Sequence, residues 1–432
     1  MRRHRLCLSI ALGALALCST HSLAATYKVI YSFQGGADGQ TPYSDLVADS
    51  SGNLYGTTTN GGNLAFCNGS GCGTVFELKR SEGGGWEHKV LYSFGNSPDG
   101  ELPKGGLVLD EAGALYGTTA AGGANGWGTV FKAAPTPRGG WQETVIYSFT
   151  GNADGYVPTA DLTIDKSGNI YGTTTGGNLY CASGQGSNGC GAVFELTPQA
   201  NGSWVETTIY TFDGGNGATP SSGIVLDSAG NLYGTTYYGG GAAGCGTNWR
   251  AVPPGCGIAY KLSLSGNNWL ETIPYAFTRG GGFGLYPTGG IVFANPNLAY
   301  GITQSGGDGY GTVFELIRTK EEWQQRDRHI FYGTPDGVTP VGRITPVGEN
   351  DLFGVTQAGG SDGQGVVFEL QHLPAGSKEI IIHSFSATGG DGTGPQSGLT
   401  LGPQDHLYGT TSAGGSGSAC KDGCGTVYDV AP

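Results

Sequence analysis

The sequence predicts an all-β fold, a seven-bladed β-propeller with four antiparallel strands in each blade. A Tyr-Gly-Thr-Thr phrase, strict in five copies and looser in two, occurs seven times. Successive copies start 53–67 residues apart, a period typical of arrays of one supersecondary unit. Short alternating apolar runs lie between clusters of Gly, Pro and Asp, and no segment has a helical period. The seven copies begin at Tyr55, Tyr116, Tyr171, Tyr233, Tyr300, Phe353 and Tyr408.

The second unit shows how one blade is predicted. Its first strand ends in a tight turn at Asp110, because Asp favours the first turn position and Gly113 supplies a left-handed residue. A Gly-rich loop then joins strands two and three, and a Pro/Gly connection joins strands three and four. A Gly-x-x-Pro turn, as at 39–42, is expected ahead of each first strand. The four strands are expected at residues 106–110, 114–119, 128–132 and 141–149.

The two ends of the chain predict how the ring closes. A fourth-strand sequence at 27–33 precedes any complete unit, and the last unit stops after its third strand at 425–430. The first strand is therefore expected to complete the seventh blade, which removes the open sheet edge that a linear array would leave. Residues 26–432 then form one propeller domain.

Residues 1–25 are predicted to be a signal peptide, with Arg2, Arg3 and Arg5 ahead of an apolar run at 6–18 and a small-residue cleavage site at 22–24. A secreted protein, extracellular or periplasmic, is expected. No later run approaches the roughly 20 apolar residues of a membrane span.

The charge excludes two classes of partner. The net charge is −13, and loss of the three leader arginines would make it −16. Such acidity opposes binding to nucleic acid and to anionic membranes, both of which select for Lys and Arg. A monomer that binds a carbohydrate or an extracellular protein is expected.

Eight cysteines remain after the leader, and they fall in four close pairs. An even number in an exported chain predicts disulfides within each loop. Pairing between loops and zinc half-sites are the alternatives, although no His lies near a pair. The pairs are Cys67/Cys72, Cys181/Cys190, Cys245/Cys256 and Cys420/Cys424.

All of these cysteines are predicted on one face of the ring, with the connections from strand two to three and from strand four to one. We call this the loop face. Loop lengths vary most there, notably at 239–257. Binding residues favour variable loops on a rigid scaffold, so this face is the predicted binding surface.

The repeats, with Gly-Asn-Leu-Tyr-Gly-Thr-Thr at 52–58 and 230–236 and Gly-Thr-Val-Phe-Glu-Leu at 73–78, resemble the GloVer-type tandem repeat of exported bacterial proteins. The resemblance covers nearly the whole chain after the leader. It implies a propeller-like surface or extracellular protein, often with a C-terminal sorting anchor. This chain ends at Val430-Ala431-Pro432, so free release is expected. The resemblance implies no catalytic residues.

Acidic residues offer two kinds of site. Five aspartates precede Gly in the turn ahead of strand one, where they could form a ring that binds calcium or a cationic substrate. The competing explanation is that each caps its own turn, which suits a residue repeated in most blades. These aspartates are Asp38, Asp99, Asp154, Asp336 and Asp391.

Non-repeated acids near the loop face, Glu101, Asp161 and Asp308 with Asp45, could act as a glycosidase pair. The histidines after the leader fall on predicted outer strands or on the opposite face. A Ser-His-Asp triad or a histidine metal site on the loop face is therefore not expected, and neither catalytic residues nor a metal are predicted.

Aromatic residues in the loops of units one to five are the predicted ligand contacts, because aromatic faces stack on sugar rings or bury against a protein. The alternative is that they roof loops that have little else to pack. They are Phe66, Trp127, Tyr180, Tyr237, Tyr238, Trp249 and Tyr310. By contrast, the Trp residues that begin five fourth strands are predicted to pack between blades.

Three functional hypotheses follow. The first is a non-catalytic propeller that binds a carbohydrate or protein through its disulfide-braced loop face. The second is a carbohydrate-active hydrolase or lyase that uses loop-face carboxylates. The third is a structural protein of the cell surface or matrix. A propeller fold alone does not choose among them.

Overall fold

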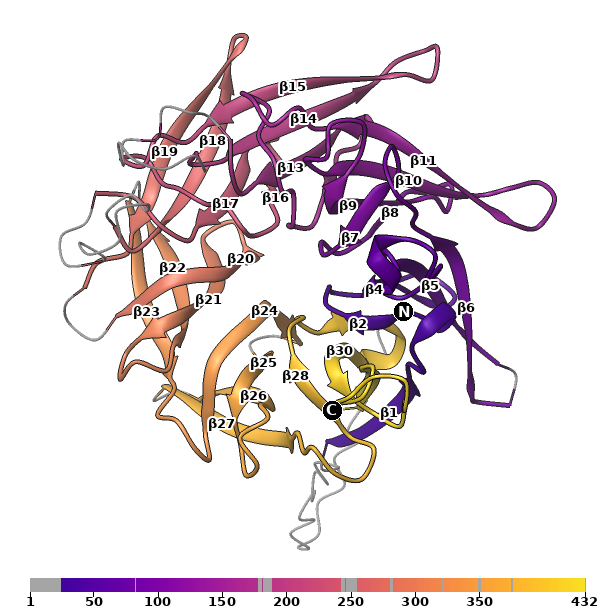
Figure 1. Ribbon diagram of the computed structural model, residues 1–432. Coiled ribbons are helices and arrows are strands. Elements are labelled where there is room, and N and C mark those ends of the chain that lie inside the picture. Colours follow the sequence, from indigo (N-terminus) through magenta and orange to yellow (C-terminus); the bar gives the residue numbers. More distant parts are fainter. Residues whose placement is uncertain are drawn as a thin grey trace, which may run out of the picture.

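The computed structural model describes residues 25–81, 83–177, 181, 189–241, 245, 255–279, 283–320, 322–348, 351–373 and 376–431. Seven small antiparallel sheets stand in a ring around a central channel, which confirms the seven-bladed propeller (Figure 1). Within the described ranges, the helical elements are single 3-10 turns at η1 (Gly36–Asp38), η2 (Cys67–Gly69) and η3 (Pro403–Asp405). No described helix has the length and apolar character needed to cross a membrane.

The strands of each blade run in order from the channel to the rim, and we number the blades along the chain. Blade 1 contains β2 (Gln40–Pro42), β3 (Val47–Ala48), β4 (Leu54–Asn60), β5 (Thr74–Arg80) and β6 (Trp86–Ser93). Blade 2 contains β7 (Gly100–Pro103), β8 (Val108–Leu109), β9 (Leu115–Gly122), β10 (Thr129–Pro135) and β11 (Trp141–Ser148). Blade 3 contains β12 (Thr163–Ile164), β13 (Ile170–Thr174), β14 (Ala192–Pro198) and β15 (Trp204–Thr211). Blade 4 contains β16 (Val225–Leu226), β17 (Leu232–Thr236), β18 (Ile258–Ser265) and β19 (Asn268–Ala276).

The remaining three blades complete the ring. Blade 5 contains β20 (Gly284–Asn295), β21 (Leu298–Gly306), β22 (Thr312–Thr319) and β23 (Glu322–Ile330). Blade 6 contains β24 (Gly337–Val347), β25 (Asp351–Gly359), β26 (Val366–Leu373) and β27 (Gly376–Ser384). Blade 7 contains β28 (Gly392–Pro395), β29 (Thr400–Leu401), β30 (Leu407–Gly414), β31 (Thr426–Ala431) and, from the other end of the chain, β1 (Thr26–Ser32).

The predicted closure is confirmed in blade 7. Strand β1 pairs antiparallel with β31, from Thr26 opposite Ala431 to Ser32 opposite Thr426. Figure 1 shows the indigo β1 along the outer side of the yellow last blade. The Tyr27 hydroxyl also donates a 2.7 Å hydrogen bond to Asp391, so a side chain reinforces the backbone ladder.

The repeated phrase is explained by strand pairing within the blade. Gly56 lies opposite Phe76, and a Cβ at Gly56 would come within 2.7 Å of side-chain atoms of Leu46 and Phe76. The position is glycine because the ring of the next strand occupies its side-chain space. Thr58 and Thr74 fix the register with a 2.8 Å bond between their hydroxyls, and the same pairing recurs in blades 2, 5 and 7.

The core lies between the blades. At each of the seven junctions, the aromatic residue that follows an outer strand packs edge-on against an aromatic residue of the next blade, with centroids 5.0–5.3 Å apart. Phe33 and Phe76 form the pair that joins blades 7 and 1, and both are fully buried. The outer-strand tryptophans pack between blades as predicted, for example Trp86 against Tyr408.

The prediction that the Gly-x-x-Pro segments are turns is wrong for three blades. In blades 1, 2 and 7 these segments form the first part of the inner strand, at β2, β7 and β28. Thr41, with φ of 59°, donates its N–H to the Cys424 carbonyl of the preceding blade at 2.9 Å. Pro42 packs so tightly on Gly425 that a Cβ there would lie 2.5 Å from the proline ring. The motif therefore joins neighbouring blades.

The inner strands are also interrupted, which positions the site described below. In blade 2 the predicted strand at 106–110 is only β8 (Val108–Leu109), separated from β7 by four residues. In blades 5 and 6 the inner strand is continuous, but its register shifts between Pro287 and Ile291 and between Val341 and Thr345. The extra residues of these bulges line the channel.

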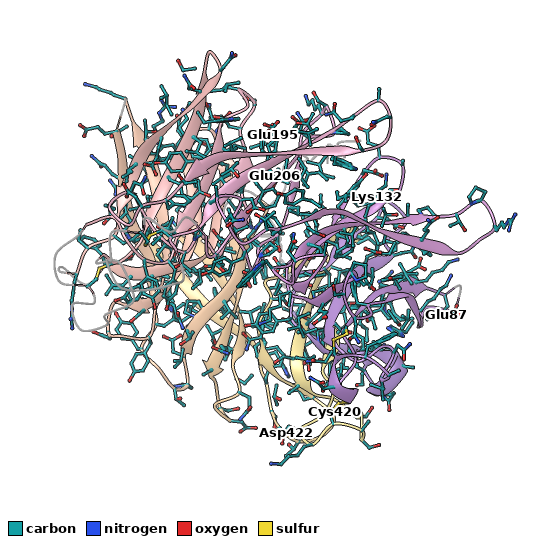
Figure 2. All side chains as sticks on the ribbon, turned by 45° about the horizontal axis from the view of Figure 1, so that its top comes forward. Glu87, Lys132, Glu195, Glu206, Cys420 and Asp422 are labelled. Carbon is teal, nitrogen blue, oxygen red and sulfur yellow. A yellow bond between two sulfur atoms is a disulfide. The ribbon has the colours of Figure 1, made fainter. Side chains whose placement is uncertain are left out.

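The four predicted disulfides are confirmed, each within its own loop and with Cα atoms 5.2–5.3 Å apart. The within-loop bonds use all eight cysteines, so pairing between loops and zinc binding by these cysteines are both wrong. Figure 2 shows Cys420 in the loop between β30 and β31. The bonds lie in blades 1, 3, 4 and 7, all on the loop face.

At least one cysteine of each disulfide is buried in the core. Cys190 and Cys256 are fully buried, as is Cys72. The reason is their place in the chain, just ahead of the third strand, where each packs into the apolar core between two blades. The carbonyls of Cys190 and Cys256 also accept N–H bonds from the next blade, at 2.8 and 2.9 Å. These cysteines are therefore core residues that tie each loop to the blade junction, and they offer no ligand contact.

Candidate functional site in the central channel

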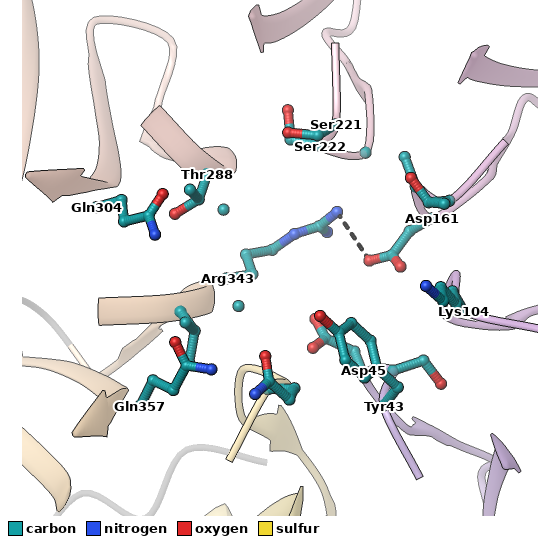
Figure 3. A pocket seen from close by; sticks show the side chains of 18 of the residues that line it. Tyr43, Asp45, Lys104, Asp161, Ser221, Ser222, Thr288, Gln304, Arg343 and Gln357 are labelled. Atoms are coloured by element: carbon teal, nitrogen blue, oxygen red, sulfur yellow. Dashed lines mark ion pairs between the residues drawn. The ribbon is translucent and has the colours of Figure 1, made fainter. Parts of the chain in front are cut away.

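A cavity of about 420 Å³ occupies the channel and is lined by residues of all seven blades (Figure 3). Its walls come from the interrupted inner strands and from the second strands of blades 5 and 6. Most lining side chains are polar, with Ser, Thr and Gln predominating. One lining residue from each blade in turn is Asp45, Lys104, Asp161, Ser222, Thr288, Arg343 and Gln396.

One repeated position supplies the charged centre of the cavity. The third residue after each inner-strand proline is glycine in four blades, but it is charged in three. A Cβ at Gly106 would lie 2.6 Å from an Asp161 oxygen, and one at Gly223 would lie 2.8 Å from Arg343 Nη2, so these glycines make room for the charged side chains. The seven residues, from blade 1 to blade 7, are Asp45, Gly106, Asp161, Gly223, Gly290, Arg343 and Gly398.

Asp161 and Arg343 reach across the channel from blades 3 and 6. Their Oδ2 and Nη2 atoms are 3.5 Å apart, and Figure 3 marks this ion pair. Asp161 also accepts a 2.6 Å hydrogen bond from the N–H of Gly106 on the preceding blade. About a third of each side chain is exposed, at 29% for Asp161 and 35% for Arg343. The pair is therefore open to a ligand.

Asp45 occupies the equivalent position in blade 1 and accepts a 2.6 Å hydrogen bond from the N–H of Gly398. Burial first, and then the charge of Asp161, raise the pKa of Asp45 to about 7, against the opposing effects of Arg343 and the Gly398 N–H. Asp45 therefore exchanges a proton near neutral pH. Asp161, by contrast, has a guanidinium partner in Arg343 and an N–H donor in Gly106.

Two further groups extend the polar wall. The Lys104 ammonium lies 5.7 Å from the centre of the Tyr43 ring. On the other side of the channel, Tyr237 donates a hydrogen bond to Gln304, which lines the cavity. Tyr237 also stacks on Tyr286 with centroids 5.2 Å apart. The predicted ligand contact Tyr237 thus supports the cavity wall.

Three other predicted aromatic residues pack over the connections between blades, which agrees with the alternative that these residues cover the loops. Phe66 packs over Gly95, Trp127 over Gly151 and Tyr310 over Gly333. Trp127 keeps 45% and Tyr310 40% of its surface exposed, so each still offers one face to solvent. Tyr238 is half-buried against Tyr286, and Tyr180 and Trp249 lie outside the described residues.

The four non-repeated acids that were predicted near the loop face do not lie together. Asp161 lines the cavity with Asp45, whereas Glu101 lies in β7 opposite Ala121 and Asp308 is exposed in the loop between β21 and β22. Neither of the latter two lines the cavity. Sequence reasoning missed Arg343, and the signal that identifies it is the break in the glycine repeat after the inner-strand prolines.

The five turn aspartates cap their turns, which bears out the structural interpretation. Asp99 accepts bonds from the Gly95 N–H at 2.6 Å and the Tyr92 hydroxyl at 2.9 Å. Equivalent backbone N–H groups donate to the other four aspartates. Their carboxylates point into the junctions between blades rather than toward one common ligand.

Comparisons with known proteins agree with the architecture. The family model of the Gloeobacter/Verrucomicrobia repeat matches residues 16–181 and 175–428. No curated protein matches the chain. A Bacteroides uniformis protein whose suggested activity is that of a 6-phosphogluconolactonase is 14% identical, with a TM-score of 0.50 over 80% of this chain and 86% of that one. A puromycin-hydrolyzing peptidase from Mycobacterium tuberculosis is 10% identical, with a TM-score of 0.50 over 89% of this chain and 52% of that one. These structural likenesses show the fold alone.

Proposed function

Because the chain belongs to the Gloeobacter/Verrucomicrobia repeat family, a match that brings a repeat architecture and no catalytic residues, we propose its function from its own channel. The protein is a non-catalytic propeller that binds a carbohydrate, and the ligand occupies the central cavity. The disulfides indicate an oxidising extracellular or periplasmic environment, where such ligands are common.

The break in the glycine repeat is the observation that carries this proposal. Asp45, Asp161 and Arg343 replace a residue that four blades keep as glycine, so the charges are not required by the repeat itself. A cavity of about 420 Å³ falls in the range of small-molecule sites and is too narrow for a folded protein domain. Carboxylate, guanidinium, hydroxyl and amide groups together match the hydroxyl groups of a sugar.

The exposed ring faces of Trp127 and Tyr310 extend the same proposal to longer ligands. A short saccharide would occupy the channel alone. A longer chain would emerge at the loop face and stack on these rings, which keeps a secondary role for the predicted aromatic contacts.

The test is a panel of neutral and acidic oligosaccharides, measured by glycan microarray and then by calorimetry. Arg343→Gln and Asp161→Asn should weaken binding of a short ligand at least tenfold, because each removes a charge from the cavity. Trp127→Ala is the matched control and should leave short-ligand affinity unchanged. Full affinity in both channel variants, or loss only in Trp127→Ala, would contradict the channel site.

Hydrolysis is the second candidate, and the two aspartates favour it. Asp161 pairs with Arg343, while the pKa of Asp45 is raised to about 7. Glycosidases use two carboxyl groups in different environments as general acid and general base. Asp45 would protonate the departing glycosidic oxygen, and Asp161 would accept a proton from the attacking water. New reducing ends from a polysaccharide mixture, lost in Asp45→Asn, would favour hydrolysis over binding.

A further inference from the structure

Each junction between blades contains three side chains at fixed places on the rim, which we call the rim triad. The first comes from the outer strand of one blade, the second from the turn that follows it, and the third from the outer strand of the next blade. At the junction of blades 2 and 3 they are Tyr147, Asp154 and Glu206. Figure 2 shows Glu206 on β15.

At three junctions the tyrosine that is the first member of the triad donates its hydroxyl to the turn aspartate. Tyr92 donates to Asp99 at 2.9 Å, and the equivalent bond at the junction of blades 2 and 3 has the same length of 2.9 Å. At the junction of blades 7 and 1, Tyr31 donates to Asp38 at 2.6 Å. In these triads an O–H group satisfies the turn aspartate, and one atom of the third member, Glu143 Oε1 or His88 Nε2, stays without a partner at two of them.

The junction of blades 5 and 6 differs from these. Its rim triad is His329 from β23, Asp336 from the turn and Glu379 from β27. His329 Nε2 lies 3.5 Å from Asp336 Oδ1 and 3.7 Å from Glu379 Oε2, and one potential ligand atom of each residue lies within 4.8 Å of the other two. The side chains are 15–16% exposed.

Three polar atoms of this triad are buried and lack a hydrogen-bond partner in the described part of the chain. They are His329 Nε2, Asp336 Oδ1 and Glu379 Oε1. A buried donor or acceptor without a partner is costly, and two neighbouring carboxylates repel each other. A cation held by one atom of each side chain would offset both costs.

The next junction shows that a histidine at this place can bond directly to its aspartate. His383 Nε2 lies 2.8 Å from Asp391 Oδ2, and the hydroxyl of Tyr27 donates to Asp391 Oδ1 at 2.7 Å. With a tyrosine as third member, that triad closes by hydrogen bonds. With Glu379 as third member, the triad of blades 5 and 6 keeps buried atoms that have no hydrogen-bond partner.

We propose that His329, Asp336 and Glu379 bind a divalent transition-metal ion, of which Zn²⁺ is the best match. Imidazole nitrogen and carboxylate oxygen are both zinc ligands at bond lengths of roughly 2.0–2.2 Å. Such bonds in tetrahedral geometry put ligand atoms about 3.4 Å apart, and the observed separations are 3.5 and 3.7 Å. Water would complete the coordination shell.

The place of the site assigns the ion a structural role. Disulfides brace blades 1, 3, 4 and 7, and residues 284–384, which form blades 5 and 6, contain no cysteine. The junction of blades 5 and 6 is the one place in the ring where neither neighbour has a disulfide. An ion bound by residues of both outer strands joins these two blades at the rim.

The test uses the protein without its leader and without a polyhistidine tag, stripped with a chelator and dialysed. Titration with Zn²⁺ should give one bound ion per chain, and Co²⁺ should give the visible absorption of a tetrahedral site. His329→Tyr introduces the residue type that five other junctions have at this place, and it should lower Zn²⁺ affinity at least 100-fold without unfolding the ring. Glu379→Gln should lower it at least tenfold.

His383→Tyr is the matched control, since it makes the same change at the neighbouring junction, and it should bind Zn²⁺ like the wild type. The proposal is overturned if the wild type binds no more Zn²⁺ or Co²⁺ than His329→Tyr does. Equal loss in His383→Tyr would also overturn it, because the ion would then not be specific to this triad. If the wild type binds no more metal than His329→Tyr does, a proton shared among the three side chains would take the place of the ion.

Discussion

At the residue scale, the channel depends on a few substitutions in a repeated framework. Asp45 and Asp161 take the same place in blades 1 and 3, and each accepts an N–H from the glycine of the preceding blade. Their environments nevertheless differ, because Arg343 bonds Asp161 directly at 3.5 Å. Identical backbone positions thus place one carboxyl group beside a guanidinium and another where burial raises its pKa to about 7.

We predict that ionisation of Asp45 makes the free energy of unfolding depend on pH. Its pKa is raised from 3.8 to about 7, so the folded state binds the proton more tightly than the unfolded chain does. The stabilisation is present at low pH, and the free energy of unfolding falls as pH rises from about 4 to about 7. Asp45→Asn should remove this slope and gain about 1–3 kcal/mol relative to the wild type at pH 8.

Urea unfolding at pH 5 and pH 8 measures the effect. Asp308→Asn is the control, because Asp308 is exposed in a loop and should follow the wild type. Parallel pH profiles for Asp45→Asn and the wild type would show that the channel does not perturb this carboxyl group.

At the element scale, the repeated strands could be predicted and the inner strand could not. The Tyr-Gly-Thr-Thr and outer-strand sequences alternate clearly, and both pair as expected. The Gly-x-x-Pro segment has the composition of a turn, yet it pairs with β4 because Pro42 needs no N–H in the ladder and packs on the preceding blade. The bulge behind it depends on contacts between blades, which local sequence does not encode. Arg343 was missed for this reason.

Substitution of the glycine in the repeated phrase tests the packing explanation. Gly56→Ala would place a Cβ 2.7 Å from Leu46 and Phe76, so it should destabilise the protein by about 1–3 kcal/mol. Gly83→Ala, in the hairpin between β5 and β6, is the control, because its Cβ would meet no atom within 4 Å. Chemical denaturation compares the two. Equal effects would mean that glycine is required there for another reason.

Loss of one disulfide is a second prediction at this scale. Replacement of Cys67 and Cys72 by Ser opens a short loop in blade 1. In the chain-entropy model such a loop contributes roughly 2 kcal/mol. We expect local opening to precede global unfolding, so limited proteolysis should cut near 63–71 faster than in the wild type while the melting temperature changes less. An unchanged cleavage pattern would contradict a bracing role.

At the scale of the whole molecule, the phase of the repeats was sufficient to predict ring closure, blade number and the face that carries the cysteines. The sequence shows an extra fourth strand at its start and a last unit without a fourth strand, and the first supplies what the second lacks. The channel chemistry was only partly predictable. Asp161 was identified as a candidate, but its partner lies 182 residues away on blade 6, and only the closed ring brings the two together.

Removal of β1 tests closure directly. A chain that begins after residue 33 lacks the outer strand of blade 7 and exposes the edge of β31. We expect it to aggregate or to melt at least 10 °C below the wild type, since an open strand edge pairs with other chains. A synthetic peptide of residues 26–33 should partly restore solubility. A soluble, monomeric truncated chain of wild-type stability would rule out a closing role for β1.

The shared blade also sets a condition on biosynthesis. Blade 7 combines β1 with β31, which is translated after every other described strand, and Tyr27 contacts Asp391 across a separation of 364 residues. Blades 1 to 6 can form in succession, but the ribosome must translate β31 before the ring is complete. Any premature stop before β31 leaves a protein that cannot seal itself, however well its earlier blades have folded.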